Sequence, residues 1–330
     1  RPLSVGGFTA ASKVYDGTAN ATVTGGVLAG AVAGDSVSLV APTGSFIDKH
    51  VGTAKSVTIG AVSLSGADKG NYSLSATSGN VTADITPKAL TVSGILVVDK
   101  VYDGKTDATL VNNEATLAGV VGVDSVTVNL AGAKATFVDK NAGTGKSVVV
   151  NNIVLSGAGA ANYSASSSTT TKGTILVRPL STWNGSVNNL WSAAGNWDAL
   201  PDGNNVLSVS IPPGSGVIVY DGGPGNTTLQ SLSSNRTLSL LGGGLQVGSD
   251  LSLPGFAQTG GTLSVAGQFK VSGNFGQSAG SVVAAGIEVF QSVGGLTLSG
   301  LRAPTVKLSA PAGTIFQTGP IVSSQLNTLS

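Results

Sequence analysis

The feature that most constrains the fold is a long internal repeat. The phrase "KVYDGTANAT" at residues 13–22 returns as "KVYDGKTDAT" at residues 100–109, an offset of 87 residues. The offset grows to 89 and then to 91 at three further matching phrases: "DSV" (35–37 and 124–126), "FIDK" and "FVDK" (46–49 and 137–140), and "NYS" (71–73 and 162–164). Short insertions of this kind fall in surface loops. The chain therefore carries two copies of one folding unit, which is typical of a building block and not of a catalytic motif.

The composition favours strands and tight turns over helices. The chain has 48 glycines, only two glutamates and 10% charged residues, while β-branched residues are abundant. Each copy contains about seven short alternating segments separated by Gly, Asp or Asn, as expected for a β-sandwich of roughly 90–100 residues. We therefore predict two tandem Ig-like β-sandwiches, residues 1–87 and residues 88–179. Pro87 and Pro179 are expected to stiffen the points where the copies end.

The sequence changes character after residue 180. Residues 182–198 contain all three tryptophans, and short alternating segments follow. A phrase that begins with Phe recurs at irregular spacing: "FAQTGG" (256–261), "FGQSAG" (275–280), "FQSVGG" (290–295) and "FQTG" (316–319). Stacked coils with loops between them fit this pattern. We predict a right-handed parallel β-helix over residues 180–330, continuing in a longer protein, so that the whole chain is all-β.

Trp183, Trp191 and Trp197 have two competing interpretations. The end of a β-helix exposes its core, and terminal units of repeat folds shield that core from water. Large rings with one polar N–H suit such a cap. The alternative is a glycan platform, on which sugar rings stack. We favour the cap because spacings of eight and then six residues place all three rings on one face of an extended segment.

The charged residues argue against several functional classes. The net charge is +1 and the Lys and Arg residues are scattered, so no basic stripe is available for nucleic acid. No apolar run is long enough to span a bilayer, and no cysteine is present for a disulfide or a thiolate metal site. Only four scattered acids follow residue 198, which is too few for paired-carboxylate catalysis: Asp202, Asp221, Asp250 and Glu288. We expect no enzymatic activity, no cofactor and no metal site.

The recurring aspartates are expected to serve turns. The pairs are Asp16 and Asp103, Asp35 and Asp124, and Asp48 and Asp139. Each acid stands singly, whereas calcium needs six to eight clustered oxygens, so turn and strand-end roles are favoured over a calcium site. His50 is replaced by Asn141 in the second copy, which indicates a turn residue. Tyr15 and Tyr102 are expected to pack at the edge of each sandwich. Recurring Lys and Asn residues also permit an isopeptide bond, whose signature is a mass lower by one ammonia per domain.

Five phrases in a fixed order resemble the YDG-type repeats of very large bacterial surface proteins: "KVYDGT", "GDSV", "FIDKHVGTAKSV", "LSGADKGNY" and "ADITPKALTV". The resemblance covers residues 1–179 and is to adhesins of the filamentous-haemagglutinin type, which are exported by two-partner secretion. The "W-x-G…W…NW" stretch at residues 183–197 is similar to an entry segment of the β-helical regions of such adhesins.

The resemblance implies a secreted protein at the bacterial outer cell surface, acting in cell attachment or biofilm matrix cohesion. It implies as partners a host-cell or matrix glycan, a polysaccharide or a surface protein, and an outer-membrane secretion partner for the longer protein. It brings no catalytic residues. We expect a monomeric spacer and stalk that contacts neither nucleic acid nor membrane. The alternative is a carbohydrate-binding or polysaccharide-processing β-helix with sandwich accessory domains, which an exposed aromatic row or an acidic cluster would favour.

Overall fold

The computed structural model describes residues 1–75, 80–111, 115–223 and 225–329. It is all-β, with 54% strand and no α-helix in these ranges, which confirms the predicted fold class. The only helical segments described are three 3-10 turns, η1 (Lys69–Asn71), η2 (Ala160–Asn162) and η3 (Ala194–Asn196). None of them has the length or apolarity needed to cross a bilayer.

The chain divides into two compact units, and the division falls within the second copy of the repeat. The first unit comprises Arg1–Val97, Thr109–Ala135 and Val149–Thr171, and the second comprises Val98–Ala108, Thr136–Val148 and Lys172–Ser330.

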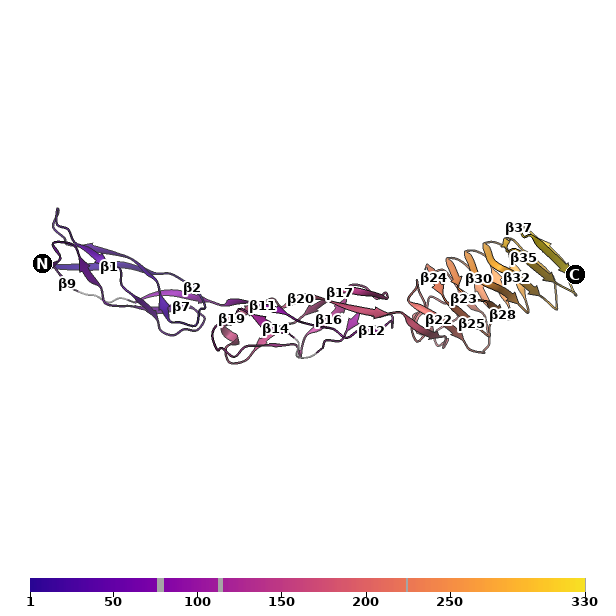
Figure 1. Ribbon diagram of the computed structural model, residues 1–330, viewed down its shortest axis with the longest axis horizontal. Helices are drawn as coiled ribbons and strands as arrows, with labels where there is room; N and C mark the ends of the chain where they lie inside the picture. The colour runs from indigo at the N-terminus through magenta and orange to yellow at the C-terminus, as the bar shows by residue number, and fades with distance from the viewer. Residues whose placement is uncertain (76–79, 112–114, 224, 330) are drawn as a thin grey trace. The chain divides into compact units, whose positions relative to one another are not determined.

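The first copy forms small sandwich-like sheets with the strand orders β4-β1-β9, β2-β10-β7-β6-β3 and β5-β8 (Figure 1). Its strands are β1 (Pro2–Ala10), β2 (Lys13–Val14), β3 (Asn20–Ala21), β4 (Val23–Ala29), β5 (Ser38–Val40), β6 (Gly44–Phe46), β7 (Gly52–Ile59), β8 (Ser63–Ser65), β9 (Ser73–Leu74) and β10 (Asn80–Thr86). Most neighbours are antiparallel, but β1 pairs with β9 in parallel and β10 pairs with β2 in parallel.

The second copy repeats this plan, with the strand orders β14-β11-β19, β12-β20-β17-β16-β13 and β15-β18. Its strands are β11 (Lys88–Ser93), β12 (Lys100–Val101), β13 (Asp107–Ala108), β14 (Thr116–Ala118), β15 (Thr127–Asn129), β16 (Lys134–Phe137), β17 (Gly143–Asn151), β18 (Val154–Ser156), β19 (Tyr163–Ala165) and β20 (Ser168–Leu176). The repeat in the sequence is therefore a repeat in strand order, and β11 is again parallel to β19.

Alternating side chains build the core of the first copy. In β7, Val57 and Ile59 are buried while Ser56 and Thr58 are exposed, because successive residues of a strand face opposite sides. The buried cluster comprises Tyr15, Val23, Phe46, Val57, Ile59, Val62, Ala83, Ile85, Leu90 and Tyr163. Two members of this cluster, Leu90 and Tyr163, come from the second copy, so the core of the first copy is completed by its neighbour.

Single residues connect each copy to the next strand of the chain. Pro87 alone separates β10 from β11, and Val177 alone separates β20 from β21 (Arg178–Thr182). Pro179 lies inside β21, one residue after the strand begins. β21 is the edge strand of the sheet β21-β22-β25, and an edge strand tolerates the missing N–H of proline.

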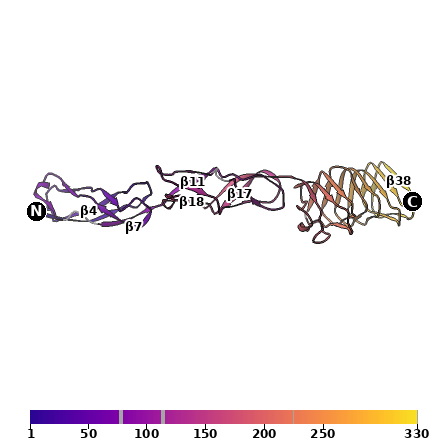
Figure 2. The same ribbon diagram turned by 90° about the horizontal axis from the view of Figure 1, so that it is seen from below.

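Residues from about 208 to 329 form a parallel β-solenoid of about six turns, as predicted for this part of the chain. Figures 1 and 2 both show its stacked coils. The strands from the start of the solenoid onward are β22 (Val206–Ile211), β23 (Ile218–Tyr220), β24 (Asn226–Leu229), β25 (Ser231–Ser234), β26 (Leu238–Leu240), β27 (Gly244–Val247), β28 (Leu251–Leu253), β29 (Phe256–Gln258), β30 (Thr262–Val271), β31 (Phe275–Gln277), β32 (Ser281–Phe290), β33 (Leu296–Leu298), β34 (Leu301–Arg302), β35 (Thr305–Ser309), β36 (Ile315–Gln317), β37 (Ile321–Val322) and β38 (Gln325–Leu329).

The first two Phe phrases mark true coil equivalents. Leu238 pairs with Phe256, and Phe256 pairs with Phe275, so the coils repeat after 18 and then 19 residues. Gln258 pairs with Gln277 in the same ladder. All of these side chains point into the core, which the two phenylalanines and the two glutamines fill layer by layer.

The last two Phe phrases are not coil equivalents, and that part of the prediction is wrong. Phe290 pairs with Ser309 and Phe316 pairs with Thr297, and the two rings are 48% and 64% exposed. In the first two phrases one residue separates Phe from Gln, whereas here the two are adjacent. Adjacent residues of a strand face opposite sides, so Phe316 faces outward.

Candidate functional site at the tyrosine joints

The turn that contains "VYDG" holds the first of two key tyrosines. The Oδ1 of Asp16 accepts the N–H of Thr18 at 2.8 Å, which is an Asx turn. Gly17 has a φ of +80°, and a Cβ there would come within 2.9 Å of Val121 in the second copy. Glycine is therefore required both by the turn and by the close approach of the next copy. The side chain of Tyr15 leaves this turn toward that copy.

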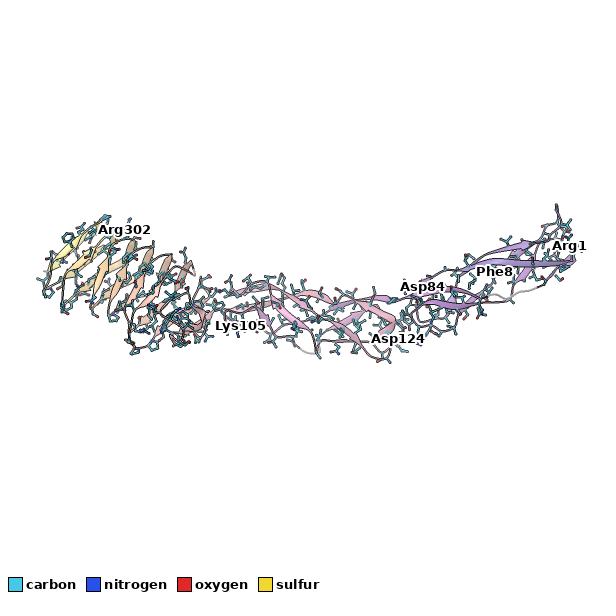
Figure 3. All side chains as sticks on the ribbon, turned by 180° about the vertical axis from the view of Figure 1, so that it is seen from behind. Arg1, Phe8, Asp84, Lys105, Asp124 and Arg302 are labelled. Carbon is cyan, nitrogen blue, oxygen red and sulfur yellow. The ribbon has the colours of Figure 1, made fainter. Side chains whose placement is uncertain are left out.

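Tyr15 is bonded to an aspartate of the second copy. Its hydroxyl donates to Oδ2 of Asp124 at 2.8 Å, and the hydroxyl of Tyr163 donates to the same oxygen at 2.7 Å. The two rings meet edge to face, with centroids 5.3 Å apart. In Figure 3, Asp124 is labelled near the end of the first copy that lies opposite Arg1. We call this contact, together with the asparagine contact described next, the first tyrosine joint.

An asparagine completes the first joint. The Oδ1 of Asn162 accepts the N–H of Val51 at 3.1 Å, and Nδ2 of Asn162 lies 3.3 Å from Nδ1 of His50. Asn162 is only 5% exposed, so these contacts satisfy a buried amide. His50 does lie in a turn, as predicted, because its N–H is bonded to Oδ1 of Asp48 at 2.7 Å. Its ring also contacts the next copy.

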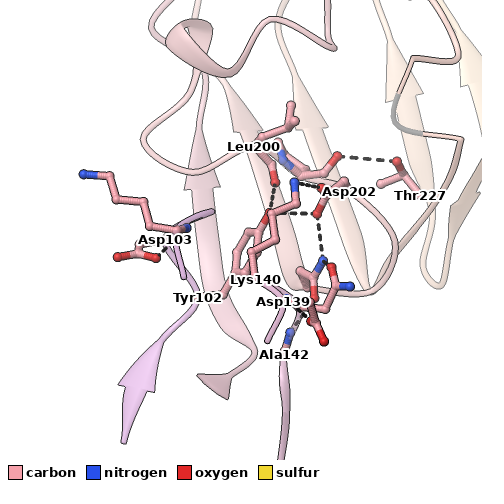
Figure 4. A network of polar contacts seen from close by, with 12 residues as sticks. Tyr102, Asp103, Asp139, Lys140, Ala142, Leu200, Asp202 and Thr227 are labelled. Carbon is pink, nitrogen blue, oxygen red and sulfur yellow. Dashed lines mark hydrogen bonds and ion pairs between the residues drawn. The ribbon is translucent and has the colours of Figure 1, made fainter. Parts of the chain in front are cut away.

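Tyr102 forms the second tyrosine joint, with the segment that precedes the solenoid. Its hydroxyl lies 2.7 Å from Oδ1 of Asp202 and 3.2 Å from the carbonyl oxygen of Leu200 (Figure 4). The ammonium of Lys140 makes an ion pair with Oδ2 of the same aspartate. Tyr102 is fully buried, so the phenol has exchanged water for these partners.

An asparagine occupies the same place in the second joint. The Oδ1 of Asn205 accepts the N–H of Ala142 at 2.7 Å, and Nδ2 donates to Oδ1 of Asn141 at 3.1 Å. Ala142 and Asn141 are the second-copy counterparts of Val51 and His50 at the offset of 91 residues. The two joints therefore share a tyrosine bonded to an aspartate and an asparagine that accepts the N–H after the "F-x-D-K-x" loop.

The strand register supports this equivalence. Asn162 immediately precedes Tyr163, which pairs with Lys88. Asn205 immediately precedes Val206, which pairs with Arg178. Lys88 and Arg178 are the first residues of the strands that leave the two copies. The second sandwich and the segment before the solenoid thus place an asparagine at the same register position relative to the incoming strand.

The environment of the first joint keeps the carboxylate charged and the phenols neutral. Burial, and then the hydrogen bond to Asp124, raises the pKa of Tyr15 to about 12. Hydrogen bonds from Tyr163 and from Tyr15 lower the pKa of Asp124. The bonds are therefore charge-assisted at neutral pH, which makes them stronger than bonds between neutral groups.

The second joint has the same electrostatics with one added cation. Burial, followed by the hydrogen bond to Asp202, raises the pKa of Tyr102. Burial by itself would raise the pKa of Asp202, but the hydrogen bonds from Lys140, Asn205 and Tyr102 outweigh it and lower that pKa. The pKa of the tyrosine is raised and that of the aspartate is lowered, so the neutral phenol and the charged carboxylate are the forms present at neutral pH.

The predicted turn roles hold for two of the three aspartate pairs. Each of the four carboxylates accepts the N–H two residues later: Asp16 from Thr18, Asp103 from Lys105, Asp48 from His50 and Asp139 from Asn141. The role is wrong for Asp124, whose side chain receives two tyrosine hydroxyls. Across the described ranges, no group of three or more His, Cys, Asp or Glu side chains is placed to hold a metal ion.

The three tryptophans lie against the first coil of the solenoid. The ring of Trp191 contacts those of Trp197 and Tyr220 at centroid distances of 4.6 and 5.3 Å, and Trp197 contacts Trp183 at 4.9 Å. Trp191 also donates its ring N–H to the carbonyl of Pro201 at 2.9 Å. This is the packing that a cap requires, with aromatic rings covering the end of a core.

The rings converge for a different reason from the one predicted. The segment is not extended; it folds back, so that Trp183 and Trp197 form an antiparallel bridge. A fully buried amide holds the loop, because Oδ1 of Asn196 accepts the N–H groups of Val187 and Asn188 at 2.9 and 3.1 Å. The tryptophans are only 0–5% exposed, whereas a stacking platform for sugars needs an open ring face.

Sequence reasoning missed both tyrosine joints. It placed Tyr15 and Tyr102 at a sandwich edge, but they are 1% and 0% exposed and bond to the next element. A usable signal was present, because a buried tyrosine hydroxyl needs a partner and an aspartate recurs with it in each copy. The sequence did not show that the partner belongs to the next element of the chain.

Tandem copies of one β unit, each bonded to the next element, define a modular repeat protein. The model of the YDG domain matches residues 1–79 and 86–171, which is half of the chain. The chain therefore belongs to the YDG-domain family. No curated protein and no solved structure matches it.

Proposed function

We propose that the chain is a structural, non-enzymatic segment of a secreted bacterial adhesin, in which the YDG copies act as spacers and the solenoid as a stalk. The observation that carries this proposal is the tyrosine joint. Charge-assisted bonds from buried phenols to partly buried aspartates hold each copy to the next element at two places. Such joints suit a spacer, whose successive units must stay attached to one another at fixed contacts.

The resemblance of the ordered phrases to repeats of filamentous-haemagglutinin-like adhesins supports a place at the bacterial cell surface. On this proposal the parent protein is exported by two-partner secretion and acts in attachment or biofilm matrix cohesion. Its receptor is a glycan, a polysaccharide or a surface protein bound elsewhere in the parent. The carbohydrate-processing alternative gains no support from the three tryptophans, whose rings are covered.

Localisation is the first test. An antibody raised against this chain should label intact cells or the culture medium, and protease added to intact cells should remove the signal from the cells. Labelling that requires lysis would overturn a surface role.

The spacer role is tested by shortening the parent without disturbing a joint. Deletion of residues 88–177 places Pro87 directly before Arg178, so that Tyr15 meets the segment that carries Asp202. We expect export to continue and attachment to weaken in proportion to the lost length. Normal attachment by the shortened protein would argue against a spacer, and loss of export would argue for a role in secretion.

A further inference from the structure

The first copy carries, at its other end, the same chemical groups that receive a tyrosine in the two joints. Asp35 and Asn71 are the counterparts of Asp124 and Asn162 at the offsets of 89 and 91 residues. The N-terminal nitrogen of Arg1 donates to the carbonyl of Asn71 at 2.6 Å. In the second joint, the N–H of Arg178 likewise donates to the carbonyl of Asn205, at 2.9 Å.

The internal hydrogen bonds of this end are already in place. The hydroxyl of Tyr72 donates to Oδ2 of Asp35 at 2.5 Å and accepts the N–H of Val32 at 3.0 Å. In the first joint, Tyr163 makes the same two contacts, with Asp124 and with the N–H of Val121. The receiving surface of the first copy is therefore organised as the occupied surface is.

This end of the first copy differs from the two joints in the exposure of its polar residues. Asp35 and Asn71 are exposed, whereas Asn162 and Asn205 in the joints are 5% and 3% exposed. Within the described ranges, the only side chain that donates to Asp35 is Tyr72. An organised aspartate and asparagine lie open at a place where two equivalent pairs are covered.

We propose that Asp35, Asn71 and Tyr72 form a binding surface for the tyrosine end of a further YDG-type repeat joined ahead of Arg1. The phenol of that repeat donates to Asp35, and the backbone N–H that comes after its "F-x-D-K-x" loop donates to Oδ1 of Asn71. The occupant is a YDG repeat because both occupied joints use this tyrosine and this loop. It is not a second copy of this chain, whose two tyrosine ends are already engaged.

The test adds one repeat to the full chain. Joining residues 1–87 ahead of Arg1 places Pro87 before Arg1 just as it stands before Lys88. Because the chain contains no cysteine, pairs of single cysteines can carry spin labels for pulsed electron-resonance distances. Thr82→Cys in the added copy with Ser38→Cys reports on the new joint. Thr82→Cys of the original copy with Thr127→Cys, the counterpart of Ser38, reports on the first joint.

We expect a distance distribution across the new joint as narrow as that across the first joint. Asp35→Ala, or phenylalanine in place of the added copy's tyrosine, should abolish the narrow distribution at the new joint and leave the first joint narrow. Asp107→Ala, which changes an exposed acid outside the joints, should affect neither. A broad distribution at the new joint beside a narrow first joint would overturn the proposal. So would a narrow distribution that survives both substitutions, because the connecting strand alone would then hold the repeats.

Discussion

At each joint, the hydroxyl of a buried tyrosine connects one copy to the next element through a hydrogen bond. The chain has no cysteine, and the recurring Lys55 and Lys146 lie at 2.6 Å from carboxylates, in ion pairs with Asp48 and Asp139. The buried phenol instead gains a charged acceptor in the next element. A hydrogen bond to a charged group contributes more to stability than one between neutral groups, and it is costly to leave a buried group without its partner.

Tyr102→Phe should lower the free energy of unfolding by about 1.5–3 kcal/mol, because it removes a hydrogen bond from a buried phenol to an ionised aspartate. Denaturant unfolding of the full chain measures this change. The matched control is Tyr72→Phe, whose hydroxyl bonds to the exposed Asp35, and its effect should be smaller. Equal losses for the two substitutions would show that burial at the joint adds nothing.

The first joint should also give a characteristic response to alkaline pH. The folded-state pKa of Tyr15 is about 12, above the ordinary value of 10.0. Its stabilising contribution is therefore fully present below pH 10 and is lost as the pH rises from 10 to about 12. The difference in stability between the wild-type chain and Tyr15→Phe, measured by denaturant unfolding across this range, should shrink. A difference that stays constant with pH would contradict the assignment.

At low pH the aspartate governs the same joint. The pKa of Asp124 is lowered in the folded chain, so its contribution is present above the unfolded-state pKa and is lost as the pH falls through the folded-state value. The joint therefore weakens at both extremes of pH and is intact over the wide neutral range between them.

At the scale of elements, glutamines stack inside the solenoid. Nε2 of Gln277 donates to Oε1 of Gln258 at 2.9 Å, and Oε1 of Gln277 accepts the N–H groups of Ser299 and Gly300 at 3.1 and 3.0 Å. Both glutamines are fully buried. They satisfy backbone groups where one coil turns into the next, a task that an apolar residue cannot perform.

Gln277→Leu should destabilise the solenoid by about 1–3 kcal/mol, because it keeps the volume but leaves two partly buried backbone N–H groups without acceptors. Gln317→Leu is the matched control: Gln317 lies in the same ladder of strands but is exposed, and its effect should be small. Unfolding followed by tryptophan fluorescence tests both, since all three tryptophans lie beside the solenoid. Similar stabilities for the two variants would mean that the internal bonds contribute little.

Trp191→Ala tests the cap. The ring is fully buried, so its removal should cost about 3–5 kcal/mol of solenoid stability, as for other buried aromatic residues. Phe316→Ala, which removes a ring that is 64% exposed, should stay within about 0.5 kcal/mol. Binding of the unaltered chain to a glycan array, lost in Trp191→Ala without a change in stability, would favour the sugar platform over the cap.

At the scale of the whole chain, the sequence predicts the repeated parts and misses the contacts that connect them. The phrase offsets predict two copies with the same strand set, and the structure has the same sheet orders in both. The bond between Tyr15 and Asp124 spans 109 residues and joins different copies. Aligning one copy with the other reveals equivalent positions, but it does not reveal contacts across the boundary between them. The orientation of Phe316 was likewise hidden, because a shift of one residue reverses a side chain.

Residues 1–87 should fold by themselves with a cooperative thermal transition, since the described strands of the first copy pair within that copy. The isolated copy should melt at a lower temperature than it does in the full chain, because Tyr15 then loses Asp124 and Tyr163. Circular dichroism with temperature checks both points. An isolated copy that is unfolded would show that the second copy is part of its folding unit, and an unchanged midpoint would show that the joint does not stabilise it.

The shared geometry of the two joints has a consequence for how genes of this kind change. An unequal crossover that duplicates or deletes one whole repeat unit joins a tyrosine end to an Asp–Asn pair again, whether the next element is a sandwich or a solenoid. The recombinant protein then needs no compensating mutation at the new boundary. Recombination can therefore change the number of repeats by whole units without creating a new kind of boundary between elements.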